Sequence, residues 1–194
     1  GNWQAPTGRQ LHGRRLGLWG FGKIAQQLAR YGEVFGMRVW VWGRASSLER
    51  ARAAGVECAP DLESFLSESD VLSVQLKLTD DTRHLIRASD LMRMKADALF
   101  VNTSRAGLLE PGALEAALDA GRPGAAAIDV FDDEPLTDPQ HSLLGRANVL
   151  ATPHIGFVEQ DNLEAFYSGA FDNLLRFAAG DRTHLVNAQS LAGS

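Results

Sequence analysis

Apolar and polar residues follow two different rhythms along this chain. Short unbroken apolar runs, rich in β-branched and aromatic residues, predict buried strands. Longer segments with an apolar residue every three or four positions predict amphipathic helices. The predicted strands cover residues 16–19, 38–42, 56–58, 70–76, 98–101, 124–130 and 148–151.

Between these runs the pattern predicts helices over residues 23–35, 48–54, 61–67, 89–94, 111–121 and 157–179. Ser46 and Ser47 are predicted to cap the second helix, and Asp61 the third. Pro111 is predicted to open the fifth helix, which Gly121 ends. The apolar residues of the last helix gather mostly on one side: Phe166, Ala170, Phe171, Leu174, Leu175 and Phe177.

This alternation of strands and helices predicts an α/β fold, a doubly wound and mostly parallel sheet of the Rossmann-like type with helices on both faces. In such sheets ligands bind beyond the carboxyl ends of the strands. The residues to inspect are therefore those that follow the predicted strands: Gly20, Gly43, Gln75, Asn102, Asp129 and Thr152.

The first strand runs directly into a glycine-rich turn with the spacing G-x-G-x-x-A, and a helical pattern follows. In that setting the spacing predicts a dinucleotide site. Gly20 allows a tight turn, Gly22 leaves the backbone open to a pyrophosphate, and Ala25 lets the helix pack closely on the strand. The free N–H groups at the helix start then face the phosphates. A chance glycine pair in a turn is the alternative, and the flanking strand and helix argue against it.

Composition narrows the range of partners. The chain has 194 residues and a formal net charge of −5, which disfavours binding to nucleic acid. Its single cysteine, Cys58, excludes an internal disulfide, and no cluster of cysteine and histidine predicts a metal site. No apolar run is long enough to span a bilayer, so no membrane association is expected. A reducing compartment fits this composition, and we expect a cytoplasmic protein.

The end of the second predicted strand bears on the choice between NAD and NADP. A carboxylate is expected there in NAD-binding folds, to hold the ribose 2′-OH. This chain has Gly43 and Arg44 instead, followed by Ser46. Arg44 and the serine hydroxyl suit a 2′-phosphate, so the residues lean towards NADP. The alternative is that Arg44 stacks on the adenine or points to solvent, and that NAD is bound through other contacts.

Three later stretches place reactive side chains just after strands: V-N-T-S-R-A-G with Arg105, I-D-V-F-D-D-E-P with Asp129 and Glu134, and A-T-P-H-I-G with His154. Hydride transfer at a 2-hydroxy acid needs an arginine for the carboxylate, a histidine for the hydroxyl proton, and a carboxylate that orients the histidine. Taken singly, each residue is more often structural or solvated. Their shared position after successive strands favours catalysis.

In this order the motifs resemble those of the D-isomer-specific 2-hydroxyacid dehydrogenases, a family that includes 3-phosphoglycerate dehydrogenases and glyoxylate/hydroxypyruvate reductases. The resemblance implies hydride transfer between a nicotinamide cofactor, by default NAD, and C2 of a small 2-keto or 2-hydroxy acid. It implies a catalytic set of Arg105, Glu134 and His154. It also implies cofactor contacts from the following residues: Gly20, Gly22, Lys23, Ile24, Arg44, Ser46, Thr103, Ser104, Arg105, Asp129, His154 and Gly156.

The resemblance further implies a division into a nucleotide-binding domain, residues 1–157, and a return segment, residues 158–194, whose helix belongs to a largely absent substrate domain. It implies a homodimer, and we expect cofactor binding with little turnover from this chain alone. Gln75 and Lys77 depart from the histidine and proline common after the fourth strand. The alternatives are a cofactor-binding regulatory module, another hydride enzyme such as a phosphite-type dehydrogenase, and an inactive fragment.

Overall fold

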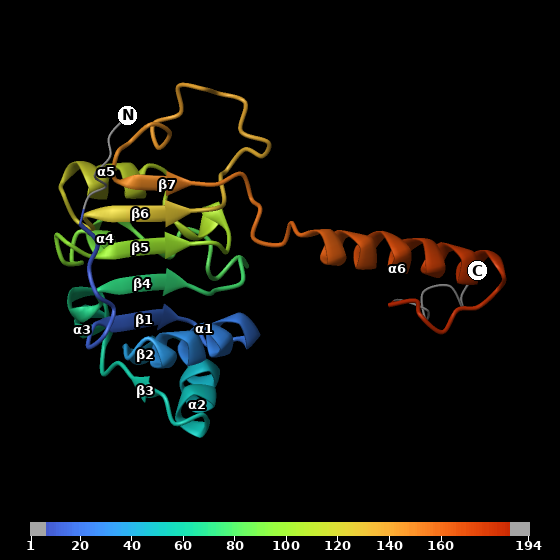
Figure 1. Cartoon of the computed structure of the whole chain (residues 1–194), viewed down its shortest axis with the longest axis horizontal. Coiled ribbons are helices and arrows are strands. Elements are labelled where there is room, and N and C mark those ends of the chain that lie inside the picture. Colours follow the sequence, from blue (N-terminus) through green and yellow to red (C-terminus); the bar gives the residue numbers. More distant parts are fainter. Residues whose placement is uncertain (1–6, 187–194) are drawn as a thin grey trace. The chain divides into compact units, whose positions relative to one another are not determined.

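The computed structural model describes residues 7–186, and the chain divides into two compact units between His154 and Ile155. The first unit contains every strand of the described residues and five of the α-helices. The second contains the C-terminal helix (Figure 1). The boundary that we predict after residue 157 remains a prediction.

One parallel sheet forms the centre of the first unit (Figure 1). Its strands lie in the order β3-β2-β1-β4-β5-β6-β7, and each strand pairs in parallel with its neighbours. The order reverses between β1 and β4, which makes this the switch point of a doubly wound sheet. The predicted fold class is confirmed. The strands are β1 Arg15–Trp19, β2 Arg38–Trp42, β3 Glu57–Cys58, β4 Val71–Val74, β5 Leu99–Asn102, β6 Ala125–Ile128 and β7 Val149–Ala151.

The helices of the first unit lie between the strands, as the alternating pattern predicts. A short 3-10 turn, Ala106–Leu108, also follows β5. Asp61 caps the third helix as predicted, since its carboxylate accepts a hydrogen bond from the Ser64 N–H at 2.7 Å. The helices are α1 Lys23–Val34, α2 Ala45–Ala53, α3 Leu62–Glu68, α4 Ala88–Leu91 and α5 Ala113–Asp119.

Two predicted helix starts in the first unit are wrong. Helix α2 begins at Ala45 because the extended backbone at Arg44 leads straight into it, so Ser46 and Ser47 lie inside the first turn and cap nothing. Helix α5 begins at Ala113 rather than at Pro111. Gly112 takes a left-handed φ of 73° immediately before that helix, which places Pro111 in the preceding turn.

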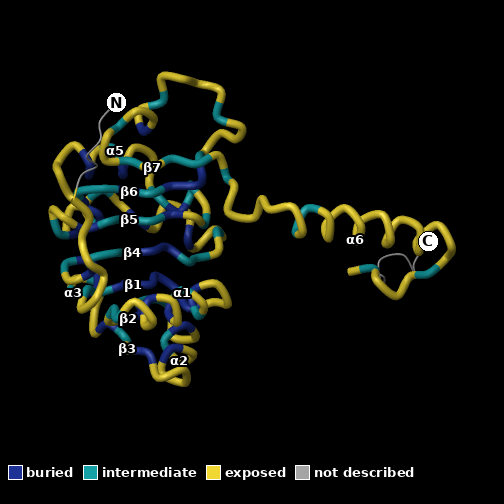
Figure 2. Tube along the Cα trace, viewed as in Figure 1, coloured by how far each residue is buried: buried dark blue, intermediate teal, exposed yellow. Residues whose placement is uncertain are grey.

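Side chains of successive strand residues point to opposite faces of the sheet, so the buried residues form two separate hydrophobic cores, one on each face. In β1, Leu16 and Leu18 belong to the core that contains Ala25 and Ala29 of α1. Trp19 belongs to the other core, which is packed by Phe65 of α3 and by residues of α5. The buried trace of the central strands is visible in Figure 2. Because the sheet is packed on both faces, its strands are held rigidly, and the residues at the strand ends occupy defined positions.

The second unit consists of a turn and helix α6, Gln160–Ala178. The carboxylate of Glu159 caps this helix by accepting a hydrogen bond from the Asn162 N–H at 2.6 Å, so the helix starts later than the predicted residue 157. No residue of α6 is buried, and its large apolar side chains are exposed (Figure 2). Across residues 7–186, no helix combines the length and apolarity needed to cross a membrane.

Candidate active site

The glycine turn between β1 and α1 has the geometry that a dinucleotide site requires. Gly20 has a φ of 100°, and a Cβ placed there would lie 2.7 Å from the carbonyl oxygen of Gln75, so only glycine fits. A Cβ at Gly22 would meet no protein atom within 4 Å. The open side of the turn at Gly22 therefore leaves room for a bound group, as its place in the motif predicts.

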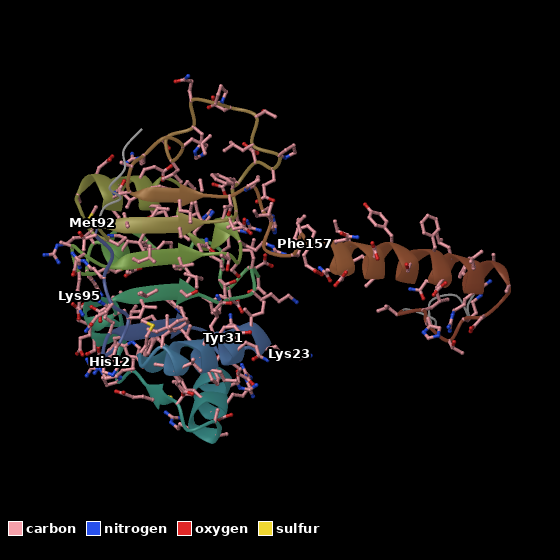
Figure 3. The ribbon with its side chains drawn as sticks, in the orientation of Figure 1. His12, Lys23, Tyr31, Met92, Lys95 and Phe157 are labelled. Atoms are coloured by element: carbon pink, nitrogen blue, oxygen red, sulfur yellow. The ribbon has the colours of Figure 1, made fainter. Side chains whose placement is uncertain are left out.

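A cavity of about 260 Å³ adjoins this turn and is lined from α1, from the segment after β4, and from Ser104. Lys23 and Lys77 both line it, although the whole chain contains only three lysines. The third, Lys95, pairs with Asp70 where the strands begin. Figure 3 shows Lys23 and Lys95 at opposite edges of the sheet. Two of the three lysines thus border one cavity beside the start of a helix, a setting suited to phosphate.

The end of β2 lies directly beside the glycine turn, since a Cβ at Gly43 would approach the Gly20 Cα to 3.6 Å. Arg44 follows, and its guanidinium contacts the Asp81 carboxylate at 3.2 Å. Both side chains are largely exposed. Ser46 is exposed in the first turn of α2. The structure thus presents a cation at the position predicted to read the ribose, with a carboxylate already beside it.

Asn102, the last residue of β5, organises the loop that carries Arg105. Its side chain is buried, its Oδ1 accepts a hydrogen bond from the Ser104 N–H at 3.0 Å, and its Nδ2 donates to the Arg105 carbonyl oxygen at 3.0 Å. The Ser104 hydroxyl donates to the Leu76 carbonyl oxygen at 2.5 Å. The loop is therefore tied to the end of β4, and the Arg105 side chain is held at the edge of the sheet.

Glu134 and His154 form the closest polar pair of the candidate site. The Nδ1 of His154 lies 2.6 Å from Oε2 of Glu134, and Oε1 of Glu134 accepts a hydrogen bond from the Phe131 N–H at 2.9 Å. The hydrogen bond with His154, then that from Phe131, with a smaller contribution from the charge of Arg105, hold the pKa of Glu134 below its usual value of 4.5. The carboxylate thus stays ionised and fixes the imidazole.

One cavity of about 250 Å³ brings the three predicted catalytic residues together. Arg105, Glu134 and His154 all line it, although they come from three separate loops. His154 has a φ of 53°, a conformation that few residues other than glycine adopt. Such strain is common where a side chain must be aimed at a ligand. The remaining lining residues are Leu78, Arg83, Ala106, Gly107, Val130, Phe131 and Asp132.

Asp129 lies buried at the end of β6, between β5 and β7. Its N–H donates to the Asn102 carbonyl oxygen at 3.0 Å, and the Thr152 hydroxyl donates to its Oδ1 at 2.6 Å. The predicted cofactor residues Ile24 and Thr103 are exposed, and Ile24 lines the cavity beside the glycine turn. Gly156 belongs to the second unit, in the turn that precedes α6.

Four residues of this edge were not among the predicted site residues: Lys77, Arg83, Asn102 and Thr152. Asn102 and Thr152 stand at strand ends, a position that marks them for inspection without showing what they bond. Asparagine before a turn often bonds the backbone two or three residues on, which is the signal that identifies Asn102. No pattern in the sequence shows that Lys77 and Arg83 come to the two cavities.

These features define a class of protein: a dinucleotide-binding domain with an arginine, a histidine and a carboxylate gathered beside the cofactor edge of its sheet. Residues 1–156 match the family described as D-isomer specific 2-hydroxyacid dehydrogenase, NAD binding domain. The chain belongs to this family, and the resemblance of its motifs is confirmed.

Individual members of this family are similar to the chain over most of its length. Glyoxylate reductase from Aeropyrum pernix is 42% identical over 183 residues, which cover 94% of this chain and 54% of that protein. A solved structure from Ralstonia solanacearum, provisionally named D-3-phosphoglycerate dehydrogenase oxidoreductase, is 50% identical with a TM-score of 0.90 and covers 93% of this chain and 52% of that one. Phosphoglycerate oxidoreductase from Vibrio cholerae O395 is 45% identical with a TM-score of 0.85, over 90% of this chain and 56% of that one.

The chain spans about half the length of the curated relatives it matches. The matching half is the nucleotide-binding domain. In those relatives, the activity, the substrate and the assembly are properties of a protein about twice as long as the region that matches this chain.

Proposed function

We propose that the protein containing this chain transfers a hydride between a nicotinamide cofactor and C2 of a small 2-keto or 2-hydroxy acid, with specificity for the D isomer. The observation that carries this proposal is the shared cavity of Arg105, Glu134 and His154 beside a glycine turn open at Gly22. Family membership supports the same reaction, because relatives are named for glyoxylate and hydroxypyruvate reduction.

The residues of the glycine turn fit a dinucleotide, since Gly20 and Gly22 keep the turn tight and open. Lys23, Lys77 and the N–H groups at the start of α1 would hold its pyrophosphate. Asp129 and Thr152 would face its nicotinamide end, and Arg44 with Ser46 its adenosine ribose. When bound, the nicotinamide supplies the hydride or accepts it.

Arg105 would bind the substrate carboxylate through its forked N–H groups and draw electron density from the adjacent carbonyl. Asn102 keeps the Arg105 backbone in place while the side chain makes this contact. A substrate without a carboxylate, such as phosphite, would use Arg105 differently, so the effect of Arg105→Ala across substrates separates the two reactions.

His154 would give a proton to the carbonyl oxygen during reduction and take it from the hydroxyl during oxidation. With Nδ1 held by Glu134 at 2.6 Å, Nε2 is the nitrogen that faces this task. The lowered pKa of Glu134 keeps its carboxylate ionised, which stabilises the imidazolium form that donates the proton. Glutamine at this position, as in formate dehydrogenases that resemble this family, suits a reaction with no proton to move.

A second candidate function is a cofactor-binding regulatory module or an inactive fragment. It is favoured by one observation: no described residue of α6 is buried, and its large apolar side chains are exposed. A substrate domain that packs on this helix and excludes water from the site would be needed for efficient turnover.

The deciding experiment follows absorbance of the reduced nicotinamide while the protein receives glyoxylate, hydroxypyruvate, pyruvate and phosphohydroxypyruvate. We expect turnover that Arg105→Ala lowers strongly, and cofactor binding by the 194-residue chain with little turnover of its own. Tight cofactor binding without turnover by any form of the protein would favour the regulatory module. Full activity of the 194-residue chain would contradict the need for a separate substrate domain.

A homodimer remains part of this proposal. Exposed Tyr31, Val34 and Phe35 at the end of α1 offer an apolar surface of the kind that subunits bury (Figure 3 shows Tyr31). Light scattering after size exclusion measures the mass directly, and a monomer at micromolar concentration would overturn it.

A further inference from the structure

Arg83 is a second arginine at the cavity of the candidate catalytic residues, and its backbone is firmly held. It follows a turn fixed by the buried Thr82, whose hydroxyl accepts a hydrogen bond from the Thr79 N–H at 2.8 Å and donates to the Lys77 carbonyl oxygen at 2.7 Å. The Arg83 N–H donates to the Thr79 carbonyl oxygen at 2.9 Å. The side chain therefore leaves a fixed point after β4.

The same region pairs with the loop that carries Arg105. The His84 N–H donates to the Gly107 carbonyl oxygen at 2.9 Å, and the Ile86 N–H donates to that of Leu108 at 3.0 Å. A Cβ at Gly107 would lie 3.5 Å from Nη1 of Arg83. The guanidinium thus lies against the segment just after Arg105.

Arg83 forms no ion pair with the carboxylates that line this cavity. Among the described residues, the Arg83 side chain makes no hydrogen bond and no ion pair. The carboxylates that line the cavity are Glu134, already bound to His154, and the exposed Asp132. An anion in the cavity would therefore meet two guanidinium groups, of which Arg105 takes the substrate carboxylate in the proposed reaction.

From this arrangement we infer that Arg83 binds a second anionic group, distal to the reacting carbon, so that the preferred substrate is a 2-keto or 2-hydroxy acid with two anionic groups. A phosphate, sulfonate or carboxylate on C3 has the required charge and shape for an arginine fork. This inference rests on the proposed function, because it takes Arg105 as the site of the first carboxylate.

Two other uses of Arg83 lead to different results. If Arg83 shared the first carboxylate with Arg105, its loss would weaken every substrate to the same degree. If it only pointed to solvent, its loss would change nothing. A matched pair of ligands separates these uses: 3-phospho-D-glycerate and D-glycerate differ only in the phosphate, and neither reacts with NADH.

The experiment titrates both ligands into the NADH-loaded 194-residue chain, by calorimetry and by the NMR shift of the His154 ring protons. We expect 3-phospho-D-glycerate to bind about tenfold more tightly than D-glycerate. Arg83→Gln should remove that advantage and leave D-glycerate within about twofold. Arg52→Gln, an exposed arginine of α2 outside the cavity, is the matched control and should alter neither.

The outcomes separate this inference from the proposed function. D-glycerate binding that depends on Arg105, with no gain from the phosphate or an equal loss of both ligands in Arg83→Gln, overturns the inference alone. Absence of any shift at His154 with either ligand, in the 194-residue chain and in the longer protein that contains it, counts against the proposed function and with it the inference.

Discussion

The edge of the sheet where the strands begin and the edge where they end both carry charged side chains, but their surroundings differ. Where the strands begin, Asp70 accepts a hydrogen bond from the Arg15 N–H at 2.7 Å and pairs with Lys95 at 2.9 Å. Where they end, Arg105 and His154 line a cavity with Glu134. The first set is closed by mutual contacts, and the second is open to a ligand.

Paired charges and cavity-lining charges thus occupy opposite edges of one sheet. Charges that satisfy each other contribute to folding, whereas charges that line a cavity keep part of their capacity for a bound molecule. Equivalent substitutions at the two edges should therefore affect stability at one edge and binding or turnover at the other.

His154→Ala should give the largest effect on function. Loss of the proton donor should lower kcat by roughly a thousandfold, while NADH affinity stays within about threefold. Kinetics on the catalytically active form of the protein and fluorescence titration of NADH measure the two quantities. Lys95→Met, at the opposite edge, is the comparison and should leave kcat unchanged. An unaltered kcat in His154→Ala would remove this residue from acid–base catalysis.

Asn102 and Asn148 provide a matched pair, because each donates a side-chain hydrogen bond to a backbone carbonyl. Asn102 donates to Arg105 where the strands end, and Asn148 donates to Gly124 at 3.1 Å where they begin. Asn102→Asp should raise KM for the keto acid by roughly ten- to hundredfold through displacement of Arg105. Asn148→Asp should change KM by less than about twofold. Equal changes of KM in the two variants would contradict the distinction between the two edges of the sheet.

Stability against acid should depend more on Asp70 than on Glu134. Burial raises the pKa of Asp70, but the hydrogen bond from Arg15 and the bond and charge of Lys95 outweigh it, so the pKa lies below 3.8. Each lowered pKa contributes stability that is complete above the ordinary value, 3.8 or 4.5, and is lost as pH falls through the folded-state pKa.

At pH 7, Asp70→Asn should lower Tm by roughly 5 °C, and Glu134→Gln by less, because the Glu134 side chain is about one-third exposed. Below pH 3 the Asp70→Asn difference should shrink. Thermal unfolding at several pH values measures both. A Tm loss for Asp70→Asn that persists unchanged into acid would show that its contribution does not come from the ionised carboxylate.

Asp81→Asn should have the smallest effect on folding but a selective effect on cofactor choice. The Arg44–Asp81 pair is exposed and adds little stability. Removing the carboxylate should strengthen NADPH binding about threefold relative to NADH, because the Arg44 guanidinium would no longer pair with Asp81 and could bind the 2′-phosphate alone. Asp80→Asn removes the same charge from the neighbouring residue and tests whether a change in net charge alone alters the choice of cofactor. Equal changes for the two cofactors would remove Arg44 from recognition of the 2′-phosphate.

Strand positions were predictable because each buried strand is a local apolar run, and parallel pairing then fixes which ends meet. The tight turn at Gly20 was also predictable from local sequence, since it follows a strand and precedes a helix. Helix starts were less predictable. Ser46 has the chemistry of a cap, but the N-cap lies at Arg44, two residues earlier, where the extended backbone leads into the helix.

Contacts between distant loops could not be read from the sequence. The meeting of Arg83 with the Arg105 loop depends on hydrogen bonds between two segments about twenty residues apart. The ion pair between Arg44 and Asp81 likewise joins residues from two different crossovers. The roles of Arg105, Glu134 and His154 remain predictions, supported now by the cavity that they share.

The hydrogen bonds that join residues 84–86 to residues 107–110 also couple the two arginine-bearing loops mechanically. Neither loop can shift far without moving the other, so the distance between the backbone positions of Arg83 and Arg105 is fixed. Ligands that differ by one methylene between their two anions would then be distinguished by length, even when their charges are identical.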